Sequence, residues 1–88
     1  MQVYYNKRFL KDLVKIPHPF RNRLEALVFQ DIPKYNHYSE IQNIGKIKGF
    51  KSYYRIRQGD YRIGLKIVGS KIVFERVLHR KDIYKYFP

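Results

Sequence analysis

The stretch "SYYRIRQGDYRIGLKIVGSKIVFERVL", residues 52–78, sets the fold, because apolar and polar residues alternate along it with a period of two. This period is typical of β-strands with one buried face. The pairs Gly59-Asp60 and Gly69-Ser70 interrupt it, and two-residue turns of this kind join antiparallel strands. The stretch therefore predicts an antiparallel meander of three strands, at 52–58, 61–68 and 71–78.

Two helices are predicted upstream of this meander. Residues 7–16, "KRFLKDLVKI", follow Asn6, a residue type that caps helix N-termini, and their apolar side chains recur at helical spacing. A tight joint at 16–19 leads to a second helix, which begins at Pro19. Pro33 is expected to end that helix, because proline lacks the N–H group that the helix needs.

The remaining segments complete an α+β fold. Residues 2–5, "QVYY", predict a short strand, and residues 33–45 predict an irregular connection. The order is β-α-α-β-β-β, with an antiparallel sheet packed on a helical hairpin and a short helical turn at the C-terminus. Residues 1–88 are expected to form one domain, because the chain is too short for two hydrophobic cores.

Composition excludes several classes of protein. The absence of cysteine rules out disulfides and thiolate-bound zinc, and it fits a cytoplasmic location. The chain shows no secretory signal and no apolar run long enough to span a bilayer, so no membrane association is expected. His18, His37 and His79 lack metal-ligand spacing, so neither a metal nor another cofactor is expected.

Positive charge is the strongest compositional signal. Nineteen Lys and Arg against seven Asp and Glu give a formal net charge of +12. Residues 45–88 carry +9 of this charge and residues 1–44 carry +3. An excess this large and uneven indicates a polyanionic partner, either nucleic acid or an acidic protein.

Strand alternation assigns the side chains of the hairpin to two faces. The turn at 59–60 places Arg57 opposite Arg62 and Arg55 opposite Gly64. One face, called the arginine face here, then carries Arg55, Arg57, Arg62 and Lys66, and continued alternation adds Glu75, Val77 and His79. The face toward the helices carries Tyr54, Ile56, Tyr61, Ile63, Leu65 and Ile67.

Opposed arginines repel each other across a strand pair, and an anion between them turns that cost into affinity. A solvated basic face with no ligand is the alternative. Arg76 falls on the core side of this alternation. Either its strand contains a bulge or Arg76 pairs with a carboxylate such as Glu25 or Asp12.

The hairpin block "KIKGFKSYYRIRQGDYRIGL" (46–65), combined with "HRKDIYKYF" (79–87), resembles the RelE/ParE superfamily of toxins over essentially the whole chain. RelE-type members of this superfamily are mRNA interferases. The resemblance implies a toxin of a type II toxin–antitoxin system that cleaves mRNA on the ribosome in the cytoplasm. It also implies a cognate antitoxin, expected to be acidic, that wraps the toxin with a helix or an extended tail.

The resemblance also assigns candidate residues. Basic positions around the hairpin turn, an arginine after the last strand and a C-terminal tyrosine correspond to Arg55, Arg57, Arg62, Arg80 and Tyr84, with Tyr86 as a second candidate for the tyrosine. Some relatives have Lys-x-Lys where this chain has Arg55-Ile56-Arg57, and arginine cannot act as a base. Because histidine titrates near neutral pH, His79 is the first candidate for proton transfer and Glu75 the second.

The predicted catalytic residues are Arg57, Arg62, His79, Arg80 and Tyr84. The residues predicted to bind RNA without taking part in the reaction are Lys46, Lys48, Lys51, Arg55, Lys66, Lys81 and Tyr86. The expected reaction is metal-free attack by the RNA 2′-OH, giving a 2′,3′-cyclic phosphate. Two other functions stay open: a ParE-like DNA gyrase inhibitor that cuts nothing, and a basic RNA-binding protein without catalysis.

Overall fold

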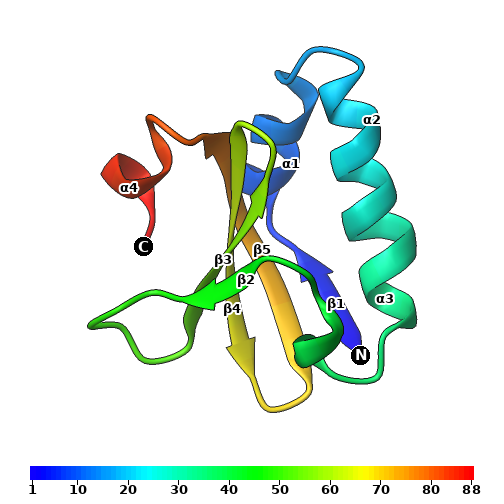
Figure 1. Cartoon of the computed structure of the whole chain (residues 1–88), viewed down its shortest axis with the longest axis vertical. Helices are drawn as coiled ribbons and strands as arrows, with labels where there is room; N and C mark the ends of the chain where they lie inside the picture. The colour runs from blue at the N-terminus through cyan, green and yellow to red at the C-terminus, as the bar shows by residue number, and fades with distance from the viewer.

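A five-stranded sheet forms the centre of the computed structural model, which describes all 88 residues (Figure 1). The strands are β1 (Gln2–Tyr5), β2 (Ile44–Lys46), β3 (Tyr53–Gln58), β4 (Tyr61–Val68) and β5 (Lys71–His79), in the spatial order β1-β5-β4-β3-β2. The strands β2 to β5 pair antiparallel, and β1 pairs parallel to β5. The predicted α+β fold and meander are confirmed. The short strand β2 begins within residues 33–45, where the sequence predicts an irregular connection, so this part of the prediction is wrong.

Helix α1 (Lys7–Val14) begins as predicted, because the Asn6 side chain accepts the backbone N–H of Phe9 at 3.0 Å. A second helical run joins α2 (Phe20–Glu25), a π-helical segment (Ala26–Asp31) and α3 (Ile32–Lys34). No helix in the structure is long and apolar enough to span a membrane.

The prediction that Pro33 ends the second helix is wrong, because the π-helical segment accommodates the proline. In its wider turn the Ile32 N–H donates to Leu27 O, which leaves the carbonyl of Val28 without that hydrogen bond. Pro33 has no N–H to offer this carbonyl. The hydroxyl of Tyr5 donates to it instead, at 2.6 Å, and so replaces the missing helical bond.

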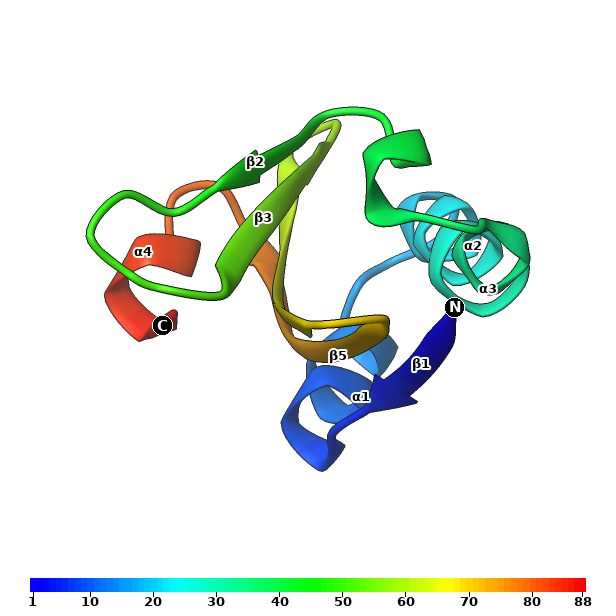
Figure 2. The ribbon, with the colours of Figure 1, turned by 90° about the horizontal axis from the view of Figure 1, so that it is seen from below.

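The main core lies between the sheet and the helices α1 to α3. Figure 2 shows α2 and α3 on one side of the sheet and α4 (Ile83–Tyr86) on the other. The apolar residues predicted to face the helices are in this core: Ile56, Ile63, Leu65 and Ile67 are buried, and Tyr54 and Tyr61 pack against them.

A β-bulge interrupts the pairing of β4 with β5. Leu65 pairs with Phe74, but Gly64 pairs with Arg76, so Glu75 is an additional residue. Beyond the bulge the alternation of β5 is reversed, and Val77 is buried in the core. The prediction that Val77 and His79 lie on the arginine face is therefore wrong, because it assumed uninterrupted alternation.

Arg76 combines both alternatives that the sequence left open. The bulge places it opposite Gly64, and its guanidinium binds Asp12 of α1. Arg76 Nε and Nη2 donate to the two carboxylate oxygens at 2.8 and 3.2 Å, and Asp12 Oδ2 also accepts the backbone N–H of Val77 at 3.1 Å. The hydrogen bond to Asp12 raises the pKa of Arg76 above its ordinary value, so the guanidinium stays charged.

The predicted short C-terminal helical turn, α4, covers the middle of the arginine face. Ile83 and Phe87 are both buried there, although they lie outside the main core. A Cβ atom added to Gly64 would lie only 2.6 Å from the Phe87 ring, so the absence of a side chain makes room for the ring. The arginine face is therefore less open than its sequence pattern suggests.

Candidate functional site

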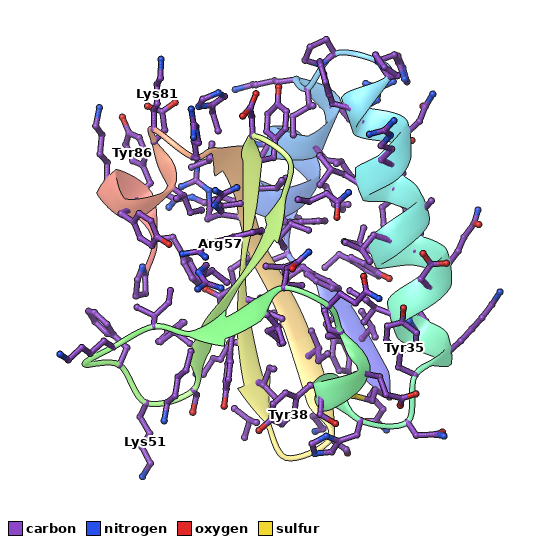
Figure 3. All side chains as sticks on the ribbon, viewed as in Figure 1. Tyr35, Tyr38, Lys51, Arg57, Lys81 and Tyr86 are labelled. Carbon is purple, nitrogen blue, oxygen red and sulfur yellow. The ribbon has the colours of Figure 1, made fainter.

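The site is centred on two arginines that lie opposite each other at the β3–β4 hairpin. Arg57 pairs with Arg62 and Arg55 with Gly64, as the turn length predicts. Arg57 is exposed, and Figure 3 shows it on the side of the sheet that faces α4. Arg62 Nη1 donates to Gly59 O at 2.8 Å and to Tyr61 O at 2.9 Å. These two bonds hold the Arg62 guanidinium against the turn.

Arg80 follows β5 and lies beside the same turn. Its backbone N–H donates to Asp60 O at 2.8 Å, and its Nε lies 3.8 Å from the Asp60 carboxylate. Both side chains are largely exposed, so this ion pair contributes little stability. The backbone contact joins the end of β5 to the hairpin. Arg57, Arg62 and Arg80, called the arginine cluster below, therefore gather around one turn.

His79 lies outside the face predicted for it. It pairs with Tyr61, whose side chain faces the core, and the two rings meet edge to face with centroids 5.8 Å apart. His79 Nδ1 accepts the backbone N–H of Lys81 at 3.2 Å. In the neutral ring the hydrogen is then on Nε2, which can donate a hydrogen bond. His79 is next to Arg80 in the chain, but the side chains of Arg57 and Arg62 lie on the other face.

The two tyrosines of α4 are the exposed aromatic groups beside the arginine face. The exposed fractions of Tyr84 and Tyr86 are 59% and 61%. The Tyr86 ring lies 5.7 Å from the guanidinium carbon of Arg76, a distance at which a cation attracts an aromatic face. Tyr84 has no comparable contact, so its ring is available to a ligand.

The other predicted RNA-binding residues spread over a wider surface. Arg55 Nη1 lies 3.4 Å from Asn43 O, and Lys66 lies over the Tyr53 ring, with Nζ 5.7 Å from its centroid. The exposed lysines of β2 and of the loop after it are Lys46, Lys48 and Lys51. In Figure 3 Lys51 and Lys81 project from opposite ends of the molecule, so the predicted residues do not form a single cluster.

A cavity that the sequence does not indicate lies on the other side of the hairpin turn. It measures about 200 Å³ and is lined by Phe20, Arg23, Leu24, Gln58, Gly59, Asp60 and Tyr61. Only the fold brings the start of α2 to the β3–β4 turn, and no local pattern indicates this contact. Phe20 follows Pro19 on the apolar side of the predicted helix, and its exposed fraction of 49% becomes apparent only in the structure.

Comparisons with known proteins identify the class of this protein. A family model described as the ParE toxin of type II toxin–antitoxin systems matches residues 3–84. The chain therefore belongs to this family of type II toxins within the RelE/ParE superfamily, which confirms the resemblance found in the sequence.

Its similar relatives carry RelE names. Toxin RelE3 of Methanocaldococcus jannaschii is 46% identical over 89 residues, with 100% of both chains covered. The toxin-containing RelB–RelE antitoxin–toxin complex from Methanococcus jannaschii has a TM-score of 0.81 at 45% identity, covering 97% of this chain and 99% of that chain. The RelE–RelB complex from Pyrococcus horikoshii has a TM-score of 0.67 at 25% identity, covering 93% and 97%. The chain is thus a RelE-type toxin.

Proposed function

We propose that this toxin is an endoribonuclease that cleaves mRNA on the ribosome without a metal ion. The observation that carries the proposal is the arginine cluster, in which Arg57 and Arg62 lie opposite each other and Arg80 lies beside the same turn. Two opposed cations destabilise a sheet unless an anion lies between them. The RNA backbone supplies such an anion, and arginine matches the geometry of phosphate oxygens.

The reaction in this proposal uses the 2′-OH of the RNA as the nucleophile. It attacks the neighbouring phosphorus, the bond to the 5′-oxygen breaks, and the products are a 2′,3′-cyclic phosphate and a 5′-OH end. Arg57, Arg62 and Arg80 stabilise the negative charge that develops on the phosphorane oxygens. Tyr84 stacks on a base or donates the proton to the leaving oxygen.

Proton removal from the 2′-OH needs a group other than arginine. The bulge residue Glu75 and His79 are the two candidates. His79 lies on the core side of the hairpin with its ring against Tyr61, whereas the side chains of Arg57 and Arg62 lie on the other face. Glu75 lies between Phe74 and Val77, which are both buried, beside Arg76. This position of His79 reverses the order expected from the sequence, so we assign the base to Glu75 ahead of His79. The pH profiles of Glu75→Gln and His79→Ala distinguish the two candidates.

The proposal includes an acidic antitoxin as the cognate partner. The relatives from both archaea were solved as complexes of a toxin with its antitoxin. The net charge of +12 favours an acidic polypeptide over the arginine face. Such a partner covers Arg57, Arg62 or the segment 79–87 and raises the melting temperature of the toxin by mass action.

The test removes the arginine cluster and leaves the fold intact. Arg62→Ala and Arg80→Ala are each expected to reduce cleavage about a hundredfold to a thousandfold, because a transition-state cation is lost. Growth arrest on expression and primer extension on mRNA are the readouts, and circular dichroism checks folding. Arg8→Ala, which removes an exposed charge from α1, is the matched control. A double variant of Arg62 and Arg80 that folds and stays fully toxic contradicts the proposal.

The second candidate function is inhibition of DNA gyrase without nuclease activity. One observation favours it: the matching family model carries the ParE description. A gyrase supercoiling assay separates the two functions. Inhibition of supercoiling by the purified toxin, together with intact mRNA in the primer-extension assay, supports the second candidate.

A further inference from the structure

The cavity beside the hairpin turn has the features of a binding site for a flat ligand. It opens between the start of α2 and the β3–β4 turn, which lie close together in Figure 1. At about 200 Å³ it is smaller than the roughly 300–1,000 Å³ of pockets for drug-sized molecules. Its lining combines the buried Leu24 with the hairpin residues 58–61, called the rim here. A single ring system is therefore the ligand size that suits it.

Phe20 provides a surface on which such a ring can stack. Its side chain lines the cavity and has an exposed fraction of 49%. The rings of Phe20 and Tyr61 have centroids 5.9 Å apart and planes inclined by 45°. Insertion between two rings needs about 7 Å, two carbon–carbon contact distances. A flat ligand therefore stacks on the outer side of Phe20.

The rim of the cavity carries groups that can recognise the edge of the ligand. The Gln58 amide forms no hydrogen bond within the protein, and the Asp60 carboxylate is engaged only by the exposed Arg80 at 3.8 Å. A carboxylate accepts two adjacent N–H donors, and an amide both donates and accepts. Guanine presents such a pair of donors on its Watson–Crick edge, whereas uracil presents one.

The cavity and the arginine cluster share one turn. Asp60 lines the cavity, and Arg62, two residues further along the strand, belongs to the cluster. Two residues of strand span about 7 Å. Arg23 adds a cation on the α2 side of the cavity. The cavity lies on the core side of the hairpin and the Arg57 and Arg62 side chains lie on the other face, but Arg62 Nη1 reaches Gly59 O at 2.8 Å, and Gly59 also lines the cavity. A single-stranded RNA that passes around this turn can therefore place a base over Phe20 while a neighbouring phosphate lies at the cluster.

We propose that this cavity binds a nucleobase of the RNA strand next to the phosphate in the arginine cluster, with preference for guanine. This inference rests on the proposed function for the source of the base. Phe20 stacks on the base, Gln58 and Asp60 bind its edge, and Arg23 pairs with a flanking phosphate. The cavity thereby sets the base preference at one position beside the cut.

The binding step is tested with the full-length toxin and free nucleotides, so it does not depend on cleavage. In an NMR titration with guanosine 5′-monophosphate, the backbone amides of Phe20, of Leu24 and of residues 59–61 are expected to shift. Uridine 5′-monophosphate is expected to bind more weakly. Phe20→Ala should weaken binding of guanosine monophosphate about tenfold, in the range measured for loss of one base–aromatic stack. Asp60→Asn should reduce the preference over uridine monophosphate and retain stacking.

Phe29→Ala is the matched control, because Phe29 is 40% exposed on the same helical run and lies outside the cavity. Inorganic phosphate is the second control. It is expected to shift the arginine cluster and the amides of residues 59–61, because Arg62 and Arg80 donate to carbonyls of that turn, but not the amide of Leu24 on the helix side of the cavity. A shift at Leu24 that inorganic phosphate reproduces, or that Phe20→Ala leaves unchanged, overturns the proposal. So does a pocket that responds to an antitoxin peptide and to no nucleotide.

Cleavage mapping then separates this inference from the proposed function. In primer extension on ribosome-bound mRNA, Phe20→Ala and Asp60→Asn are expected to change the base preference at one position beside the cut, while Phe29→Ala is not. Cleavage with an unaltered preference refutes the base pocket and leaves the nuclease assignment in place. Nucleotide binding at Leu24 by a toxin that cleaves no mRNA refutes the nuclease assignment, and the pocket itself is upheld.

Discussion

The substitution Gly64→Ala, which adds a single methyl group, should separate the C-terminal helix α4 from the sheet. The Cβ of Gly64→Ala would lie 2.6 to 2.7 Å from three carbons of the Phe87 ring. Carbon atoms in contact normally lie about 3.5–4.0 Å apart, so the ring must move by about 1 Å. The ring has little room, because it is buried and packs edge to face on Tyr53 at 5.5 Å.

The cost of this substitution follows from two bounds. Overpacking a well-packed site costs about 1–3 kcal/mol. Complete release of Phe87 loses the burial of one phenylalanine, about 1.5–3 kcal/mol. We therefore expect Gly64→Ala to lower the free energy of unfolding by about 2 kcal/mol. For a domain of this size that corresponds to a fall in Tm of about 8–15 °C.

Hydrogen exchange distinguishes release of α4 from general destabilisation. The amides of Lys85 and Phe87, which donate to Asp82 O and Ile83 O, should exchange much faster in Gly64→Ala, while those of β4 stay protected. Gly45→Ala is the matched control, because the three atoms nearest to its Cβ all belong to the guanidinium of Arg55, the far end of a flexible side chain. Unchanged exchange at residues 83–87 and an unchanged Tm in Gly64→Ala would refute this account of the arginine face.

Three further results are expected. In a urea titration, Asp12→Ala should lower the free energy of unfolding by about 3–5 kcal/mol, because it leaves the part-buried Arg76 without its partner. Glu25→Ala is the control: it removes the i,i+4 partner of Arg21 at the surface and should lower the free energy of unfolding by less than about 0.5 kcal/mol. Burial raises the pKa of Tyr5, so its contribution to stability is complete below about pH 10 and is lost as the pH rises through the higher folded-state value. The urea midpoint should thus fall as the pH rises above about 10, and it should fall less in Tyr5→Phe. That variant also loses about 1–3 kcal/mol at neutral pH, because the Val28 carbonyl then has no donor. Binding to ribosomes should weaken steeply between low and moderate salt, because each neutralised phosphate releases counterions. An affinity that does not change with salt concentration would contradict contact through the basic surface.

Turn chemistry explains why part of the fold and site could be predicted from the sequence. A two-residue turn at 59–60 fixes the register of β3 with β4, so the opposition of Arg57 and Arg62 follows from local sequence alone. The position of His79 could not be obtained in this way. One additional residue, Glu75, changes the face of the sheet to which each later side chain of β5 points. The local sequence around Glu75 contains no signal for a bulge.

The remaining differences come from contacts between segments that are distant in sequence. The packing of Phe87 on Gly64 and the cavity between Phe20 and the hairpin turn form only in the folded chain. The π-helical segment depends on the Tyr5 hydroxyl, which lies in β1. Periodicity does not report such contacts, because it records only which side of an element is apolar.

The carboxylate of Asp12 has a further consequence for how other molecules can approach the toxin. β1 pairs with β5 only as far as Phe74, so beyond that residue the sheet would present a free edge. There the Val77 N–H is occupied by Asp12 instead of by a neighbouring strand. An exposed edge is a template for the addition of a foreign strand, and a side chain that satisfies its donor removes that template. A foreign strand that approaches this part of β5 therefore finds the Val77 donor already occupied and has to displace the Asp12 carboxylate, which also binds Arg76.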